Sequence, residues 1–250
     1  MSKIEKYKQD LISLIQWDDY LLANSNLPGP RGNLELMQAF IEAGDEDTFL
    51  RYVKITPEQA PVNNPGEFLA FCGTVGLGKA ITPGKTAYFD ILRQQASDPR
   101  WRIREGVAWA LELAGKKDFE LVLKHTEPWA SGSFLEQRAV AAGLSHPSLL
   151  KPEKNAVRVL AILDFITRSF GPAENRKQEA FRTLRQGLGY CWSVAVAACP
   201  EAGKPIFEKL ADLHDPDIRW IMKENLKKNR LVKMDSEWVE NLLNLVSLNT

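Results

Sequence analysis

The chain has 250 residues, 44% of them apolar, and is long enough to bury a large hydrophobic core. Lysine plus arginine and aspartate plus glutamate balance at 32 each, so the net charge excludes a global attraction to nucleic acid or to anionic membranes. Any basic patch must arise from the local arrangement of side chains on the fold.

The N-terminal sequence MSKIEKYKQDLISLIQWDDY is charged and helix-periodic, and it lacks the apolar core of a signal peptide. No apolar run approaches the length that spans a bilayer, so we expect a cytoplasmic protein with no membrane partner. The three cysteines, Cys72, Cys191 and Cys199, match neither zinc-site nor redox-pair spacing. We expect buried free thiols, no metal site and no cofactor.

Apolar residues recur at spacings of three and four along most of the chain, while alternating β-branched runs are scarce, which predicts an all-α fold. The first stripe predicts a helix over residues 3 to 15 and contains Ile4, Tyr7, Leu11, Leu14 and Ile15. Further helices are expected from residue 34, from residue 48 to before Pro57, and again from about Phe68. A final helix is expected near residues 236 to 248.

The segment GTVGLGKAITPGKT, residues 73 to 86, superficially resembles a phosphate-binding loop. A P-loop requires four residues between its glycines, whereas five separate Gly78 from Gly84, and Pro83 removes a backbone donor. The preceding residues also read as a helix instead of the required strand. The glycines therefore predict a helix that a neighbour approaches closely, followed by a turn, and no nucleotide cofactor is expected.

Two later segments share one pattern. SDPRWRIREGVAWALELAG places Asp98-Pro99 before Ile103-Arg104, and HDPDIRWIMKENLKKN places Asp215-Pro216 before Ile218-Arg219. Aspartate caps a helix N-terminus, proline suits the first helical turn, and the apolar residues pack on neighbouring helices. ASGSFLEQRAVAAGL, which contains Arg138, fits the pattern loosely, and the spacings approach the ~40 residues of helical repeats.

This second-helix pattern resembles the HEAT repeat, most clearly over residues 85 to 230. The resemblance implies a single domain over residues 1–250, a right-handed α-solenoid of about five or six HEAT-like helix pairs. Residues 1–66 would form less regular helices, 67–230 the clearest repeats and 231–250 a capping helix. The resemblance specifies the fold and leaves the function open.

The concave face of such a stack is where a protein or DNA partner is expected. The leading function is therefore a non-enzymatic recognition scaffold. The candidate contact residues are Trp101, Arg102, Arg104, Arg138, Trp192, Arg219 and Lys223. Arg104 and Arg219 have an alternative structural role, because the arginine of the pattern commonly pairs with the aspartate of the adjacent turn. The tryptophans Trp109 and Trp220 are expected in the core.

A narrower similarity offers an enzymatic alternative. RWRIRE places Trp101 one helical turn from Glu105, and Arg138 follows in a segment similar to the HEAT-like bacterial DNA alkylation repair glycosylases. By this resemblance Glu105 would stabilise positive charge as a glycosidic bond to an alkylated purine breaks, and Trp101 and Trp192 would contact the DNA. The family has aspartate where this chain has Glu105, and a second tryptophan that this chain lacks.

Overall fold

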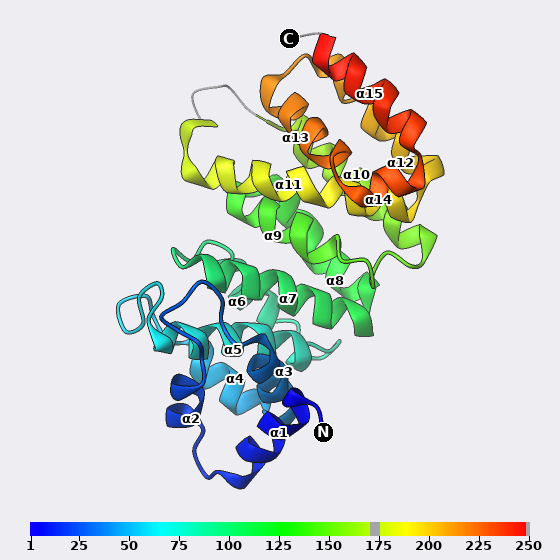
Figure 1. The fold of residues 1–250 in the computed structure, drawn as a ribbon. Coiled ribbons are helices and arrows are strands. Elements are labelled where there is room, and N and C mark those ends of the chain that lie inside the picture. Colours follow the sequence, from blue (N-terminus) through cyan, green and yellow to red (C-terminus); the bar gives the residue numbers. More distant parts are fainter. Residues whose placement is uncertain (171–175, 249–250) are drawn as a thin grey trace. The chain divides into compact units, whose positions relative to one another are not determined.

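The computed structural model describes residues 1–170 and 176–248, and all regular elements in these ranges are helical (Figure 1). The predicted all-α class is therefore confirmed. Within the described ranges, none of the helices combines the length and the apolar composition that crossing a membrane requires.

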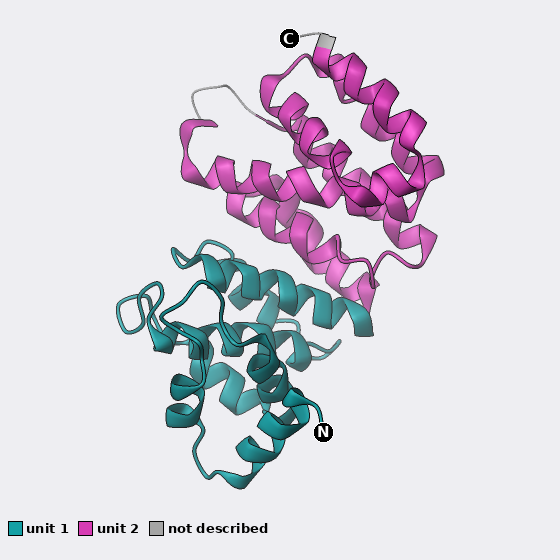
Figure 2. Cartoon of the chain, in the orientation of Figure 1, with its two compact units in different colours: residues 1–117 teal, residues 118–250 magenta. Residues whose placement is uncertain are grey.

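The chain forms two compact units, Met1–Lys117 and Asp118–Thr250 (Figure 2). The helices of unit 1 are α1 Lys3–Ser13, α2 Asp18–Ala23, α3 Leu34–Ala43, α4 Glu46–Val53, α5 Pro65–Ala80, α6 Tyr88–Gln95 and α7 Trp101–Lys117. Those of unit 2 are α8 Phe119–Thr126, η1 Glu127–Ser131, α9 Phe134–Leu144, α10 Glu153–Arg168, α11 Glu179–Ala198, α12 Pro200–Glu208, η3 Ala211–Leu213, α13 Pro216–Leu226, α14 Asn229–Met234 and α15 Ser236–Leu248.

Side-chain caps explain several helix starts. Asp215 accepts hydrogen bonds from the backbone N–H groups of Asp217 and Ile218, and Pro216 occupies the first turn of α13, as the sequence pattern predicts. The predicted N-terminal helix is wrong at its end, because α1 stops at Ser13. Ile15 lies beyond the end of α1 and is fully exposed, so the last apolar residues of the stripe are not part of the helix.

Helix α5 is the centre of unit 1 and packs against α4 and α7. The glycines of α5 permit this packing: a Cβ atom at Gly78 would lie 2.2 Å from the carbonyl oxygen of Ala110 in α7, and one at Gly76 would overlap Phe49 in α4. Residues 73 to 80 are therefore helical and closely approached, as expected, and do not form a phosphate loop.

Helix α11 has the same central role in unit 2, where it packs against α9, α10, α12 and α13. Its side chain Trp192 is fully buried, and the indole Nε1 donates to Thr167 Oγ1 of α10 at 3.0 Å. Helix α11 therefore contacts both α9, which precedes it in the chain, and α13, which follows it. The C-terminal α15 covers α13 and α14.

Candidate functional site

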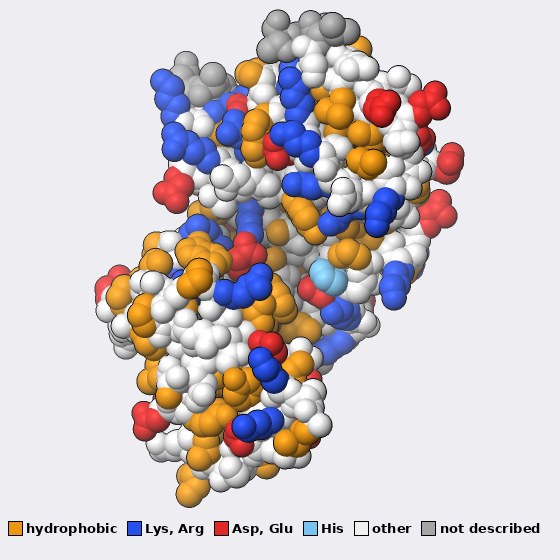
Figure 3. All heavy atoms as spheres, in the orientation of Figure 1, with side chains coloured by type: hydrophobic (Ala, Val, Ile, Leu, Met, Phe, Trp, Pro, Cys, Tyr) orange, Lys and Arg blue, Asp and Glu red, His pale blue; other side chains and the backbone are white. Residues whose placement is uncertain are grey.

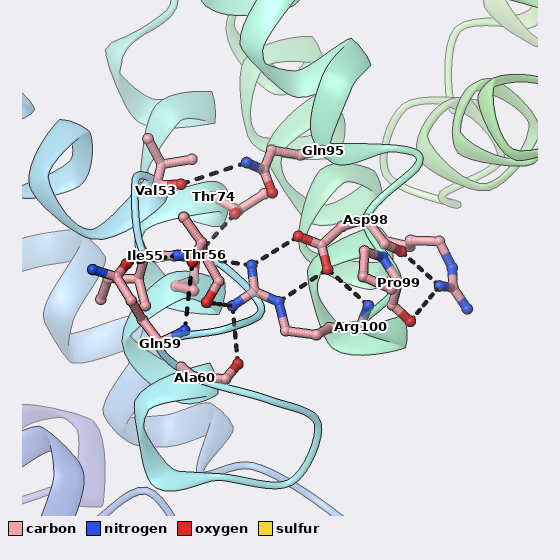
Figure 4. Close-up of polar contacts among 12 residues, drawn as sticks. Val53, Ile55, Thr56, Gln59, Ala60, Thr74, Gln95, Asp98, Pro99 and Arg100 are labelled. Carbon is pink, nitrogen blue, oxygen red and sulfur yellow. Dashed lines mark hydrogen bonds and ion pairs between the residues drawn. The ribbon is translucent and has the colours of Figure 1, made fainter.

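A buried arginine directly before helix α7 joins three segments of unit 1. The Arg100 guanidinium donates to both carboxylate oxygens of Asp98, at 2.9 and 2.7 Å, and to the backbone carbonyls of Ile55, Thr56 and Ala60 (Figure 4). Arg100 is 1% exposed, so its charge is satisfied almost entirely within the protein. This contact fixes the first turn of α7 against the loop that follows α4.

Beyond this anchor, α7 presents three residues at intervals of four, Trp101, Glu105 and Trp109. Such spacing places them on one helix face. They line a pocket of about 350 Å³. The rest of its wall consists of Pro30, Arg31, Gly32, Leu34, Phe71 and Arg102, all within unit 1. Trp101 is 44% exposed and Trp109 is 38% exposed, so both indoles offer surface to a ligand.

A buried ion pair supports one wall of this pocket. Arg102 Nη1 donates to Glu67 Oε2 of α5 at 2.8 Å, and the Arg102 guanidinium carbon lies 4.5 Å from the centre of the Trp101 ring. Arg102 Nη2 also donates to the carbonyl oxygen of Gly29, and the Gly29 N–H donates to Asn63 Oδ1. The pair therefore fixes the Trp101 ring and the loop that carries Arg31.

Unit 2 carries a second candidate surface, on α11, α13 and α14. Residues 218–233 contain six lysine and arginine residues and one acidic residue, Glu224. The Arg230 guanidinium carbon lies 4.5 Å and Lys228 Nζ 6.0 Å from the centre of the Tyr190 ring, which is 48% exposed. Figure 3 shows lysine and arginine side chains over the α11 and α13 part of unit 2, interspersed with apolar ones. We call Tyr190, Lys223, Lys228 and Arg230 the cation–aromatic surface.

Three of these cations lie outside the ion pairs of the described residues. In the described ranges of the chain, no carboxylate pairs with Lys223, Lys228 or Arg230, whereas Arg185 pairs with Asp217 and Lys227 pairs with Glu224. Tyr190 accepts a hydrogen bond from Arg230 Nη2 at 2.6 Å, which holds the guanidinium beside the ring. The arrangement offers positive charge and an exposed aromatic ring side by side.

The predicted contact residues fall in both units. Trp101 and Glu105 line the same pocket in unit 1, and Arg138 lies on α9 of unit 2 beside Gly187. The expected grouping of Glu105 with Arg138 thus remains a prediction. Arg219 and Lys223 lie one turn apart on α13, both half-buried.

Three roles expected from the sequence need correction. Trp192 is a core residue and does not offer surface to a partner, because α10 and α11 enclose it. Arg102 is 6% exposed and is held by Glu67, so its charge is not available as part of a basic surface stripe. Trp109, expected in the core, lines the pocket, and its spacing of four from Glu105 was the sequence signal for it.

Arg104 has in part the structural role that the sequence offered as an alternative, which is pairing with the aspartate of the adjacent turn. Its Nη1 donates to the carbonyl oxygens of Asp98 and Pro99, at 2.7 and 3.0 Å, and not to the carboxylate of that aspartate. Arg100 takes the carboxylate instead. The sequence pattern does not predict that Arg100, which precedes α7, binds the Asp98 carboxylate in place of Arg104.

Comparison with known proteins adds no assignment. No family model, curated protein or solved structure matches the chain. In the described ranges, no group of three or more histidine, cysteine, aspartate or glutamate side chains is arranged to hold a metal ion. The two surfaces described above therefore carry the functional argument by their own chemistry.

Proposed function

We propose that this chain is a non-enzymatic recognition protein of the helical-repeat type, and that the cation–aromatic surface of unit 2 binds single-stranded nucleic acid. The packing of α11 against α9 and against α13 supports the repeat interpretation, since in such proteins each structural repeat contacts its neighbours along the chain. The observation that carries the proposal is the pair of cations, Lys228 and Arg230, beside the exposed ring of Tyr190, with Lys223 on the neighbouring helix α13.

The chemistry of this surface favours nucleic acid over a protein partner. Single-stranded nucleic acid is bound by positive charge that follows the backbone together with aromatic rings on which bases stack. Lys223, Lys228 and Arg230 form no ion pair with a carboxylate in the described residues, although Glu224 attracts Lys228 at longer range. Their binding to phosphates can therefore release the cations condensed on the nucleic acid. The neutral total charge does not oppose this, because residues 218 to 233 carry a local excess of positive charge, six lysine and arginine residues against one acidic residue.

The test is binding of a fluorescently labelled single-stranded oligonucleotide, followed by anisotropy. We expect Tyr190→Ala to weaken binding by roughly five- to 150-fold, since loss of one stacked base costs about 1 to 3 kcal/mol. The double charge reversal Lys228→Glu with Arg230→Glu should abolish binding. A matched reversal of the exposed Lys3 and Lys6 on α1 should leave it nearly unchanged. Equal losses in both reversals, or no binding by the unmodified chain, would refute the proposal.

One observation favours a second candidate, the alkylpurine DNA glycosylase suggested by the sequence resemblance. Trp101 and Glu105, the residues that would contact DNA and stabilise charge, line the same pocket. A carboxylate beside indole rings suits a positively charged alkylated base. Release of methylated purines from duplex DNA, lost in Glu105→Gln, would establish this activity, and absence of release by the unmodified chain would exclude it.

A further inference from the structure

Helix α11 extends the cation–aromatic surface beyond Tyr190. Arg182, Gln186 and Tyr190 follow one another at intervals of four, which places them on one face of the helix, and all three are exposed. Eight residues of α-helix rise by about 12 Å. At about 3.4 Å for each nucleotide of a stacked strand, this rise corresponds to about three or four nucleotides. A strand that stacks on Tyr190 therefore reaches Arg182 within a few nucleotides.

The charge of Arg182 is available to a ligand. Of the two arginines of α11, Arg185 forms an ion pair with Asp217, and its guanidinium carbon lies 4.5 Å from the centre of the Trp220 ring. Arg182 has no ion pair and no side-chain hydrogen bond within the residues that the structure describes. A guanidinium in this state can bind a phosphate through two parallel hydrogen bonds.

The acidic side chains close to this face limit where a strand can run. Asp217 forms ion pairs with two arginines, and Glu224 forms one with Lys227, so these two carboxylates are neutralised. Glu179 lies three residues before Arg182, is exposed, and has no ion pair in the described part of the chain. Because a carboxylate repels phosphate, the binding face ends between Glu179 and Arg182.

We propose that a single strand bound at Tyr190 runs along α11 toward the N-terminus of that helix, and that Arg182 binds a phosphate about three or four nucleotides from the stacked base. Gln186 lies between the two, and glutamine side chains bond to phosphate and sugar in nucleic-acid complexes. The path rests on the proposed function of the cation–aromatic surface. It adds the direction of the strand and two contact residues that the surface does not include.

The test compares two lengths of oligothymidine. Binding of a labelled octamer is followed by anisotropy, and the affinity of the dimer is measured by its displacement of that octamer. We expect Arg182→Ala to weaken the octamer by about two- to fivefold, as for an exposed ion pair, and to leave the dimer unchanged. The salt dependence of octamer binding should become shallower by about 0.7, since one phosphate contact is lost. Tyr190→Ala should weaken both lengths.

Two further variants serve as controls. Arg182→Lys keeps the positive charge and should retain most of the octamer affinity. Arg158→Ala removes a half-exposed arginine of α10 and should change neither length. Native circular dichroism is expected for each of these variants, because both arginines lie at the surface.

The outcomes distinguish the path from the binding function itself. If the unmodified chain binds neither oligonucleotide, or if Tyr190→Ala leaves both affinities unchanged, both proposals fail. If Tyr190→Ala weakens binding but Arg182→Ala has no effect, or weakens the dimer and the octamer equally, the strand does not follow α11 and the path alone is wrong. A loss specific to the octamer in Lys223→Ala, without one in Arg182→Ala, would place the strand over α13 and would also contradict the path.

Discussion

Arg102 of α7 and Glu67 of α5 form an ion pair with 2.8 Å between Nη1 and Oε2, and neither side chain is more than 7% exposed. The second carboxylate oxygen of Glu67 and the Nε of Arg102 have no hydrogen-bond partner. The pair thus joins the two central helices of unit 1 and supports the pocket wall. Each charge depends on the other, because a lone buried charge is strongly unfavourable.

Removing one member of this pair should destabilise unit 1 severely. We expect Glu67→Gln to lower the free energy of unfolding by about 3 to 5 kcal/mol, measured by urea denaturation, because Arg102 keeps its charge in a buried site. The double variant Glu67→Gln with Arg102→Met should recover part of the loss. As a control, Lys8→Met breaks the exposed pair with Glu42 and should cost at most about 1 kcal/mol. Similar losses in the two single variants would contradict this interpretation.

Arg100 should not tolerate lysine. Its guanidinium serves Asp98 and three backbone carbonyls at once, whereas an ammonium group presents three donors from a single point (Figure 4). We expect Arg100→Lys to lower the free energy of unfolding by at least about 2 kcal/mol. Arg158→Lys, at a half-exposed site 4.0 Å from Glu127, is the matched control and should have little effect. Comparable denaturation midpoints for both variants would count against the anchoring role.

Two glycines in the same segment should respond oppositely to alanine. Gly78→Ala would place a methyl group against the α7 backbone at Ala110, and overpacking of this kind costs about 1 to 3 kcal/mol. Gly84→Ala meets nothing within 4 Å and should stabilise the chain by about 0.4 to 1 kcal/mol, by restricting the unfolded state. Thermal unfolding measures both, and a stabilised Gly78→Ala would show that α5 and α7 are not in close contact.

The thiol of Cys72 should be unreactive in the native protein. Complete burial raises its pKa well above the ordinary value, so little reactive thiolate forms near neutral pH. Cys191 and Cys199 are also buried. Ellman's reagent should therefore react slowly with the native chain and rapidly in guanidinium chloride. Rapid reaction of Cys72 under native conditions, followed by mass spectrometry, would show that α5 is accessible to solvent.

The sequence predicts local features of this fold well because their causes are local. Helical periodicity gives the all-α class, the Asp215-Pro216 cap starts α13, and the glycines of residues 73 to 78 indicate close helix packing. The N-terminal stripe fails at Ile15 because periodicity alone does not mark where a helix loses its hydrogen bonds. The number and handedness of the helix pairs stay predictions.

The candidate sites depend on contacts that are distant in the sequence. Glu67 and Arg102 are 35 residues apart, and no local pattern links them. Trp192 was expected to contact a partner and is buried, whereas Trp109 was expected in the core and is 38% exposed. The exposure of a helix face depends on which helices cover it, and the sequence alone does not show this. The spacing of Trp101, Glu105 and Trp109 does indicate a shared face, whereas the loop that completes their pocket could not be inferred from spacing.

The salt dependence of oligonucleotide binding tests the central claim most directly. For a single strand, the logarithm of the association constant falls with the logarithm of salt concentration by about 0.7 for each phosphate neutralised. We predict a steep fall for the unmodified chain and a slope shallower by about 2 after alanine replaces Lys223, Lys228 and Arg230. Binding that does not respond to salt, or an unchanged slope in the triple variant, would contradict nucleic-acid recognition by the cation–aromatic surface.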